Sequence, residues 1–260
     1  LDRVGMAYPG LRAESYSELG WLSLRRGDLS AAQDWLGRGL ELVEGTEHYD
    51  VLSSILNRLG GVHYHRGEWQ AATTCVERAL ELREQLGDVV GMARSFNNLG
   101  IVKKNAGNWS EALRSYKRSV EIHEEIGEVE GLTQALTNLG VLHTDRGEWE
   151  KAEEYLERSF DIAERIAYPY ELAQAHMNLG RLHLFQENWE RSSQHLNAAI
   201  PLYKEAGARA NLNLNDAYDL KGRWHLEQDE LGTALEWARR SRELLKEVTK
   251  TEAGDSVAWG

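Results

Sequence analysis

Histidine is the residue type whose spacing in this chain could first suggest metal binding or acid–base catalysis. Four histidines, His63, His143, His183 and His225, each stand three residues after a recurring glycine. In a chain of repeats such a column separates its members by one repeat, too far for one metal ion with bonds of about 2 Å. His63 and His65 are two positions apart on a predicted helix, so they point to different faces. We therefore predict structural histidines that are hydrogen-bonded between helices, with no metal site and no cofactor.

Other catalytic constellations are absent from the sequence. It contains no GxxxxGK[ST], HExxH, paired CxxC or GxSxG motif. The single cysteine, Cys75, falls on a predicted helix, where a small packing role is the usual one. One cysteine also excludes an internal disulfide framework. Carboxylates such as Glu121, Glu124 and Glu125 fall on outer helix faces, where solvated charge is the default. The sequence predicts a protein that is not an enzyme.

The elements that carry these residues repeat with a fixed period. A Leu-Gly pair recurs every 40 residues, at Leu19-Gly20, Leu59-Gly60, Leu99-Gly100, Leu139-Gly140 and Leu179-Gly180. A weaker sixth copy centres on Gly222, two residues late. A period of this size is typical of an array in which neighbouring repeats bury each other's apolar faces.

Each copy reads as two helices joined by a turn. In the third copy, Phe96, Leu99 and Val102 follow one face of a helix. Gly107 then stands where the chain must reverse, a position that suits a residue tolerating positive φ. Small residues recur in the second helix, at Ala32, Ala72, Ala112, Ala152, Ser192 and Ala234.

With these motifs the chain resembles the tetratricopeptide repeat family along nearly its whole length. The 40-residue unit is longer than the family's usual repeat of about 34 residues. It is similar to the variant found in kinesin light chains, Pins-type adaptors and the sensor arms of bacterial signalling ATPases and regulators. The resemblance implies an all-α, right-handed superhelical solenoid of about six stacked antiparallel helix pairs. We expect a single array over residues 1–260, with repeats at roughly 9–48, 49–88, 89–128, 129–168, 169–208 and 209–250.

Both ends of the chain look truncated from a longer protein. Residues 1–6 align with the end of a second helix 160 residues further on, and residues 257–259 could begin another helix. The last predicted helix, from Leu231 to about Thr249, keeps an apolar side that includes Leu235 and Leu245. We expect this side to self-associate or to cover the tail, because monomers rarely leave such a patch bare.

Composition narrows the class of partner. The chain carries 42 acidic and 30 basic residues, a net charge of −12, which argues against nucleic acid or an anionic membrane as the main partner. No apolar run approaches the roughly 20 residues needed to cross a bilayer, and no signal-peptide pattern opens the chain. We expect a cytoplasmic protein.

The family resemblance places ligands on the inner face of the first helix of each pair. Two residues before the repeat glycine, three successive copies carry asparagine: Asn98, Asn138 and Asn178. This column resembles the asparagine ladder by which family members hold an extended peptide. An amide side chain offers both a donor and an acceptor, so it can pair with any peptide unit. The alternative is that these asparagines bridge adjacent helices.

Further residues on the same stripe complete the candidate site. They are Arg58, Asn57, Asn97, Arg94, Gln134, Gln174, Ile101, Val141 and Arg181. Arginines on this surface of an acidic molecule would favour carboxylates in the ligand, and Gly61 could open a pocket or permit close packing. The clamp for chaperone tails needs a lysine three residues before the glycine, and this chain has none there.

These observations lead to one functional reading and one alternative. We expect a non-enzymatic scaffold that binds a peptide segment of a partner protein, with acidic side chains favoured, in its concave groove. The alternative is a sensor or regulatory arm of a larger signalling ATPase or transcription regulator, in which the groove binds an effector or a domain of its own chain.

Overall fold

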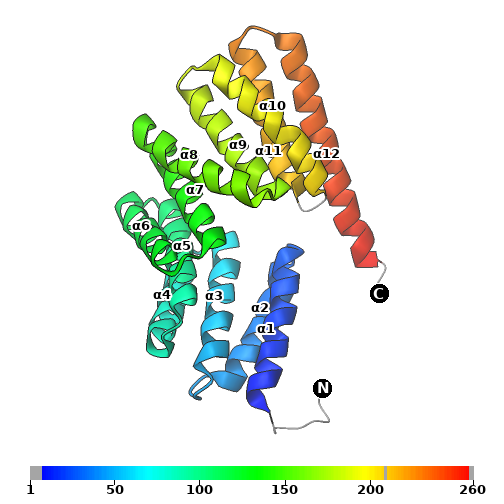
Figure 1. The fold of residues 1–260 in the computed structure, drawn as a ribbon. Coiled ribbons are helices and arrows are strands. Elements are labelled where there is room, and N and C mark those ends of the chain that lie inside the picture. Colours follow the sequence, from blue (N-terminus) through cyan, green and yellow to red (C-terminus); the bar gives the residue numbers. More distant parts are fainter. Residues whose placement is uncertain (1–7, 208–209, 258–260) are drawn as a thin grey trace. The chain divides into compact units, whose positions relative to one another are not determined.

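Twelve helices, and no strand, make up the part of the chain that the computed structural model describes, residues 8–207 and 210–257 (Figure 1). They are α1 (Pro9–Arg25), α2 (Leu29–Val43), α3 (Tyr49–His65), α4 (Trp69–Leu86), α5 (Val89–Asn105), α6 (Trp109–Ile126), α7 (Val129–Asp145), α8 (Trp149–Ile166), α9 (Pro169–Phe185), α10 (Trp189–Ala206), α11 (Asn211–Glu227) and α12 (Leu231–Val257). The predicted all-α fold of paired helices is confirmed. None of these described helices combines the length and apolar character that a membrane crossing demands.

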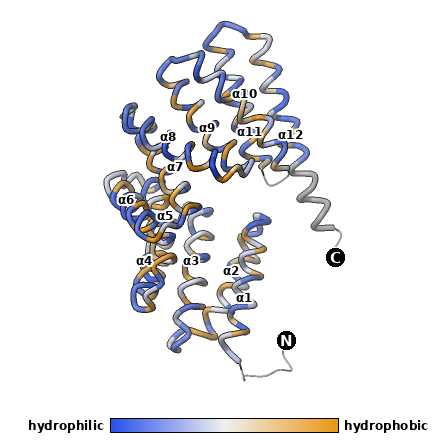
Figure 2. The backbone as a smooth tube through the Cα atoms, in the orientation of Figure 1, coloured by the Kyte–Doolittle hydropathy of each residue, from blue (hydrophilic) through white to orange (hydrophobic). Residues whose placement is uncertain are grey.

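Odd-numbered helices, which we call A helices, pair with the even-numbered B helices that follow them. Figure 2 shows hydrophilic and hydrophobic residues alternating along these helices, as expected when one side of each is buried. The chain divides into two compact units, residues 1–135 and 136–260, and the division falls within α7. The single continuous array expected from the sequence stays a prediction.

The glycine of each Leu-Gly pair lets the A and B helices approach closely. A Cβ atom on Gly100 of α5 would lie 2.5 Å from the ring of Tyr116 on α6, and one on Gly140 of α7 would lie 2.5 Å from Cγ of Leu156 on α8. Heavy atoms do not pack at that distance, so any larger residue would force the helices apart. The strict recurrence of this glycine follows from the contact.

A second glycine shapes the turn inside each helix pair. Gly107 has φ of 81°, and the corresponding residue has φ between 71° and 79° in the three other copies that carry glycine. The last two copies place Glu187 and Asp229 in this left-handed region, with φ of 58° and 59°. The turn geometry therefore persists where glycine is lost, at a conformational cost.

The histidines three residues after the repeat glycine form hydrogen bonds within this turn. Nδ1 of His143, near the end of α7, lies 2.8 Å from Oε2 of Glu148, the residue just before α8. His225 and Glu230 make the same contact at 2.7 Å, and His63 makes it with Glu68. His183 instead contacts Oε1 of Gln186, at 2.8 Å. The prediction that these histidines are structural is confirmed.

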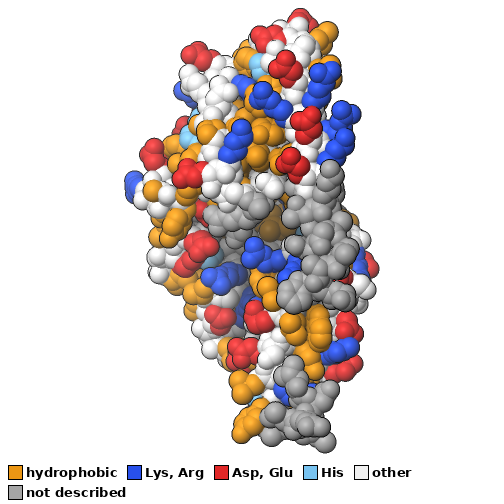
Figure 3. Space-filling model, turned by 90° about the vertical axis from the view of Figure 1, so that its right-hand side faces the viewer, with side chains coloured by type: hydrophobic (Ala, Val, Ile, Leu, Met, Phe, Trp, Pro, Cys, Tyr) orange, Lys and Arg blue, Asp and Glu red, His pale blue; other side chains and the backbone are white. Residues whose placement is uncertain are grey.

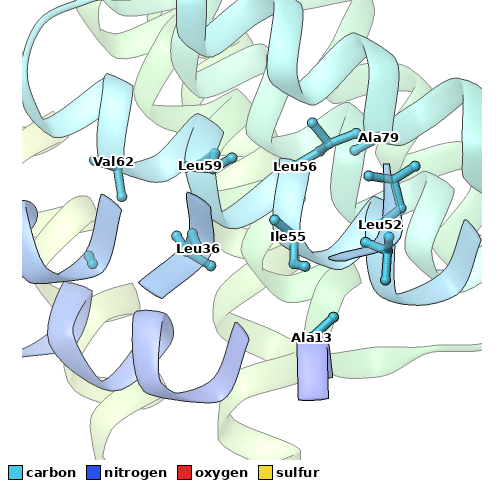
Figure 4. Close-up of a cluster of buried hydrophobic side chains, with 10 residues drawn as sticks. Ala13, Leu36, Leu52, Ile55, Leu56, Leu59, Val62 and Ala79 are labelled. Atoms are coloured by element: carbon cyan, nitrogen blue, oxygen red, sulfur yellow. The ribbon is translucent and has the colours of Figure 1, made fainter. Parts of the chain in front are cut away.

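Each unit has its own apolar core. In unit 1, Leu36, Ile55 and Val62 are fully buried where α1, α2 and α3 meet (Figure 4). In unit 2, Tyr203 of α10 and Ala217 of α11 are fully buried in the same way. These buried side chains occupy apolar positions that recur from repeat to repeat in the sequence.

The C-terminal helix differs from the sequence-based expectation. α12 runs past the expected end near Thr249 to Val257, the last residue that the structure describes, and a further helix beginning at residues 257–259 stays a prediction. Ala258 and Trp259, like residues 1–7 at the other end, lie outside the described residues. Leu235 and Leu245 are exposed, and self-association through them stays a prediction.

Lys221 occupies the place of a core leucine. It precedes Gly222 as leucine precedes the glycine in the other five repeats, and only 5% of it is exposed. Its Nζ atom donates to Oγ of Ser193 at 3.1 Å and lies 4.7 Å from the centre of the Trp224 ring. Burial lowers the pKa of this ammonium group, which the charge of Glu230 only partly opposes.

We expect Lys221→Leu to stabilise the protein. Removing a desolvated charge should raise the free energy of unfolding by about 1–2 kcal/mol, in the lower part of the range for such replacements. The buried ammonium group destabilises the protein by its full amount below the lowered folded-state pKa. This destabilisation vanishes as the pH approaches 10.5, the ordinary pKa of lysine. Urea unfolding at pH 7 and pH 10 should therefore show a gain that shrinks at the higher pH. The exposed Lys117→Leu is the control, and an equal gain there would contradict the explanation.

Candidate functional site

Two adjoining pockets form a groove on the A helices of unit 1. The first has a volume of about 460 Å³ and the second about 290 Å³. Both are lined by Trp21 of α1, by Asn57 and Arg58 of α3, and by Asn98 of α5. We call this pair of pockets the unit-1 groove. It crosses three successive A helices, and the first pocket extends to Gln134 of α7.

An amide pair lies where the two pockets meet. Nδ2 of Asn98 donates to Oδ1 of Asn57 at 2.9 Å, so the two side chains join α5 to α3. Both are half-buried. Each amide has more donor and acceptor capacity than this single bond uses. The bridging role and a ligand-binding role are therefore compatible in this pair.

Arg58 is held by residues of the first A helix. Its guanidinium donates to Oγ of Ser17 at 2.9 Å and to Oε1 of Glu18 at 2.7 Å, and it lies 5.8 Å from the centre of the Trp21 ring. Because these contacts fix its position and Glu18 offsets its charge, Arg58 forms a wall of the groove that is already organised without a ligand.

The first pocket is lined by polar and charged side chains. Arg94, Glu130 and Gln134 are exposed there, and the buried Asn97 borders the same pocket. The remaining lining residues include Arg83 and His123 near the ends of B helices, Glu128 in the turn after α6, and Gly131 at the start of α7. Figure 3 shows acidic and basic side chains mixed over the visible face, without a large area of one sign.

The second pocket is mainly apolar. Leu24, Tyr64 and Ile101 line it, and Gly61 leaves its base without a side chain. A Cβ atom on Gly61 would lie 3.3 Å from Cδ2 of Leu24, at the limit of close packing. The neighbouring repeats carry Trp21 and Ile101 at the position of Gly61. The missing side chain leaves open space in this pocket.

Unit 2 has a separate pocket of about 300 Å³ that contains Arg181. Met177, Leu220 and Arg223 also line it, with Asp216 and Asp219 of α11. Partial desolvation raises the pKa of Asp216, the neighbouring Asp219 adds to the rise, and Arg181 opposes it. Opposite charges thus face one another across a small pocket.

The structure brings together some of the residues predicted to bind a ligand. Those that line the unit-1 groove are Asn57, Arg58, Arg94, Asn97, Asn98, Ile101 and Gln134. Arg181 lines the pocket of unit 2, and Asn138, Val141 and Gln174, which also lie in that unit, are half-buried.

Two predicted asparagines are more buried than expected for ligand-facing residues. Only 4% of Asn97 is exposed, although it borders the first pocket. Asn178 is buried, and its Nδ2 atom donates to the carbonyl oxygen of Gln174 at 3.0 Å on the same helix. This bond turns the Asn178 amide towards its own helix, and its predicted contact with a ligand stays a prediction.

The residues of the unit-1 groove that sequence reasoning missed include Trp21, Arg83 and His123. Trp21 stands one residue after a repeat glycine, the position already assigned to Ile101 and Val141. Arg83 and His123 are 40 residues apart on B helices, whereas the family resemblance places ligands on the A helices. Among the described residues, no group of histidine, cysteine, aspartate or glutamate is arranged to hold a metal ion.

Comparisons with known proteins agree with this architecture. Models described as tetratricopeptide repeat match residues 51–125 and 131–205, and a further one matches residues 13–38. No curated protein matches the chain by sequence.

Solved structures show the same fold at low identity. A Rap protein in complex with competence and sporulation factor is 18% identical, with a TM-score of 0.75 over 93% of this chain and 66% of its own. A signal transduction ATPase with a tetratricopeptide repeat sensor from Pyrococcus horikoshii is 16% identical, with a TM-score of 0.71 over 95% of this chain and 40% of its own. A kinesin light chain-like protein from Podospora anserina is 15% identical, with a TM-score of 0.62 over 78% of this chain and all of its own (100%).

Proposed function

Because the chain belongs to the tetratricopeptide repeat family, whose members generally bind other proteins, we propose that it is a non-enzymatic scaffold that binds an extended peptide segment of a partner. The proposed site is the unit-1 groove, and the observation that carries it is the continuity of the two pockets across α1, α3 and α5. An extended segment can use such a groove because its backbone needs partners at several successive points.

The amide pair supports backbone recognition. Asn98 and Asn57 lie at the junction of the pockets, where any segment that occupies both must pass. Their amide groups can donate to and accept from a peptide unit irrespective of its side chains. This chemistry supplies affinity without sequence specificity.

The pocket above Gly61 supports side-chain recognition. Its lining by Leu24, Tyr64 and Ile101 suits an aliphatic or aromatic side chain of the ligand. A half-exposed Trp21 at its edge adds a flat apolar wall. The groove thus combines an apolar compartment with a polar one, and a ligand with both kinds of side chain would fill it best.

The alternative is a regulatory arm of a larger signalling protein. It is supported by the likeness to the repeat sensor of the Pyrococcus ATPase, which aligns with 95% of this chain. In that case the groove would bind an effector or a segment of the same polypeptide. A cytoplasmic location belongs to both proposals.

We expect Asn98→Ala to weaken peptide binding by about 0.5–3 kcal/mol, the range between a lost hydrogen bond and an unpaired buried group. Peptides selected from a displayed random library against the wild-type protein would serve as probes, with affinities measured by calorimetry. Gly61→Leu should weaken the binding of the same peptides, because the leucine side chain would fill the apolar pocket. Helix content should not change, because Asn98 and Gly61 are not fully buried.

The matched control is Asn197→Ala, which removes an exposed asparagine from a B helix. Its affinity should equal that of the wild type. If folded Asn98→Ala and Gly61→Leu variants keep full affinity for the selected peptides, the binding site lies elsewhere and the proposed site is wrong.

A further inference from the structure

Two successive junctions between repeats, where a B helix ends and the next A helix begins, differ from the other junctions in the same way. Residue 83 is arginine and residue 123, 40 positions later, is histidine. The equivalent residues of α2, α8 and α10 are Val43, Ala163 and Tyr203, all apolar or aromatic and fully buried. The departure therefore introduces polar groups at a core position of α4 and α6.

The same junctions also share an acidic residue and a glycine. Asp88 and Glu128 precede α5 and α7, and Gly91 and Gly131 follow three residues later. Oδ1 of Asp88 accepts a hydrogen bond from N of Gly91 at 2.9 Å, and Oε2 of Glu128 accepts one from N of Gly131 at 2.7 Å. Each acidic side chain thus caps the start of an A helix.

The glycines make room for the polar side chains. A Cβ atom on Gly91 would lie 2.8 Å from Cδ of Arg83, and one on Gly131 would lie 2.2 Å from Cε1 of His123. Other junctions carry Val51 and Glu171 at this position. Only with glycine can a side chain from the preceding B helix cross the A helix and reach the first pocket, which both Arg83 and His123 line.

Both polar side chains keep unused hydrogen-bonding capacity although they are buried. Arg83 donates from Nη1 to the carbonyl oxygen of Gly91 at 3.0 Å and to Oγ of Ser95 at 2.6 Å. Its Nε atom has no hydrogen-bond partner among the described residues, nor has Nδ1 of His123, which lies 2.9 Å from Oε2 of Glu128 without hydrogen-bond geometry. Exposed fractions are 8% and 1%. Such groups cost stability, so their presence at two junctions needs another explanation.

Arg94 adds an accessible positive charge to the same pocket. It is exposed, and it forms no ion pair among the described residues. Its charge lowers the pKa of both Arg83 and His123, although burial is the larger cause for each. Asp88 opposes the shift at Arg83, and Glu128 opposes it at His123. All three side chains line the first pocket, where one bound anion could meet them.

We infer that Arg83, Arg94 and His123 form an oxyanion subsite that takes a carboxylate or phosphate group of the bound segment. This inference rests on the proposed function for the source of the anion, but not for the existence of the subsite. Arg94 would supply the first, exposed contact, and the buried Arg83 and His123 would supply directed donors at the base of the pocket. Glu128 and Glu130 also line the pocket, and their negative charge would repel anions that make no contact with the arginines.

The test is a titration of the whole chain with two small probes, glutarate and inorganic phosphate, followed by NMR of the His123 ring and the Arg83 Nε–H group. We expect saturable shifts of both signals, and the probe that saturates at the lower concentration identifies the preferred oxyanion. Arg94→Gln should weaken binding roughly tenfold or more, since a charge-assisted contact is lost. Arg118→Gln, which removes an exposed arginine of α6 outside the groove, should bind as the wild type does.

The His123 ring provides a readout that a merely structural role would not move. It lies beside Glu128 and lines the pocket together with Arg83, Arg94 and Glu130, and burial lowers its pKa. A bound oxyanion should raise this pKa, because it favours the imidazolium form. The pH titration of His123 should therefore shift upward with the saturating probe present.

Several results would overturn the inference: no saturable shift with either probe, an equal loss of binding in Arg94→Gln and Arg118→Gln, or an unchanged His123 titration. Failure of the proposed function gives a different pattern. In that case the small probes bind as expected while Asn98→Ala leaves peptide affinity unchanged.

Discussion

Replacing Leu99 by alanine should cost about 2–5 kcal/mol of the free energy of unfolding, the usual range for a buried leucine. Leu99 is only 8% exposed in the middle of α5. The helices cannot move together to close the resulting cavity, because Gly100 already approaches Tyr116 of α6 as closely as packing allows. The full cavity penalty should therefore be felt, and urea unfolding monitored by circular dichroism measures it.

Leu86→Ala is the matched control for this prediction. Leu86 ends α4 and is 45% exposed, so its truncation should cost less than about 1 kcal/mol. A loss below about 1 kcal/mol for Leu99→Ala itself would contradict the repeat register described above.

Lowering the pH from 6.5 to about 4 should destabilise unit 2 through a cluster of three histidines. Nδ1 of His176 on α9 lies 3.0 Å from Nδ1 of His195 on α10, and the ring of His183 stacks on that of His195 with centres 5.6 Å apart. Phe160 of α8 closes the cluster, its ring centre 4.9 Å from that of His176. A hydrogen bond between two Nδ1 atoms needs one of them unprotonated, so the cluster cannot take up protons on both rings without breaking.

The sign follows from the shifted pKa values. Burial lowers the pKa of His195 to about 4, and the neighbouring histidines and Arg191 add to the shift. Burial also lowers the pKa of His176, which Glu164 opposes. A histidine whose pKa is lower in the folded than in the unfolded state costs no stability above about pH 6.5. The free energy of unfolding then falls as the pH is lowered towards the folded-state pKa. The full slope of ~1.4 kcal/mol per pH unit over the 2.5 units between 6.5 and about 4 would give about 3.5 kcal/mol, and because the slope flattens near both pKa values, the loss from His195 alone is about 2–3 kcal/mol.

His195→Phe should flatten this pH dependence, because it removes the most strongly shifted group and keeps an aromatic ring in the cluster. His48→Gln, at an exposed position of unit 1, should leave the dependence as it is. Urea unfolding at pH 7, 6, 5 and 4 gives the comparison. Parallel curves for the wild type and His195→Phe would mean that other groups cause the acid sensitivity.

The sequence by itself determined the helix pairs, because they follow from local rules. Apolar residues at helical spacing, a glycine at the closest approach of two helices and another at the turn recur every 40 residues. The same periodicity placed Asn57, Arg58 and Asn98 on one stripe of neighbouring A helices, and the structure gathers them in one groove. A position on a helix face depends only on spacing along the chain, so it can be read without a structure.

Tertiary structure decided which polar groups are free to act. Asn178 belongs to the same sequence column as Asn98, yet it bonds to its own helix while Asn98 bonds to Asn57 of the neighbouring one. That difference depends on which acceptor lies nearest in space. Arg83 and His123 reach the groove from B helices because glycines eight residues later let them cross. Such a route joins separate elements through packing, and no periodicity within a single helix predicts it.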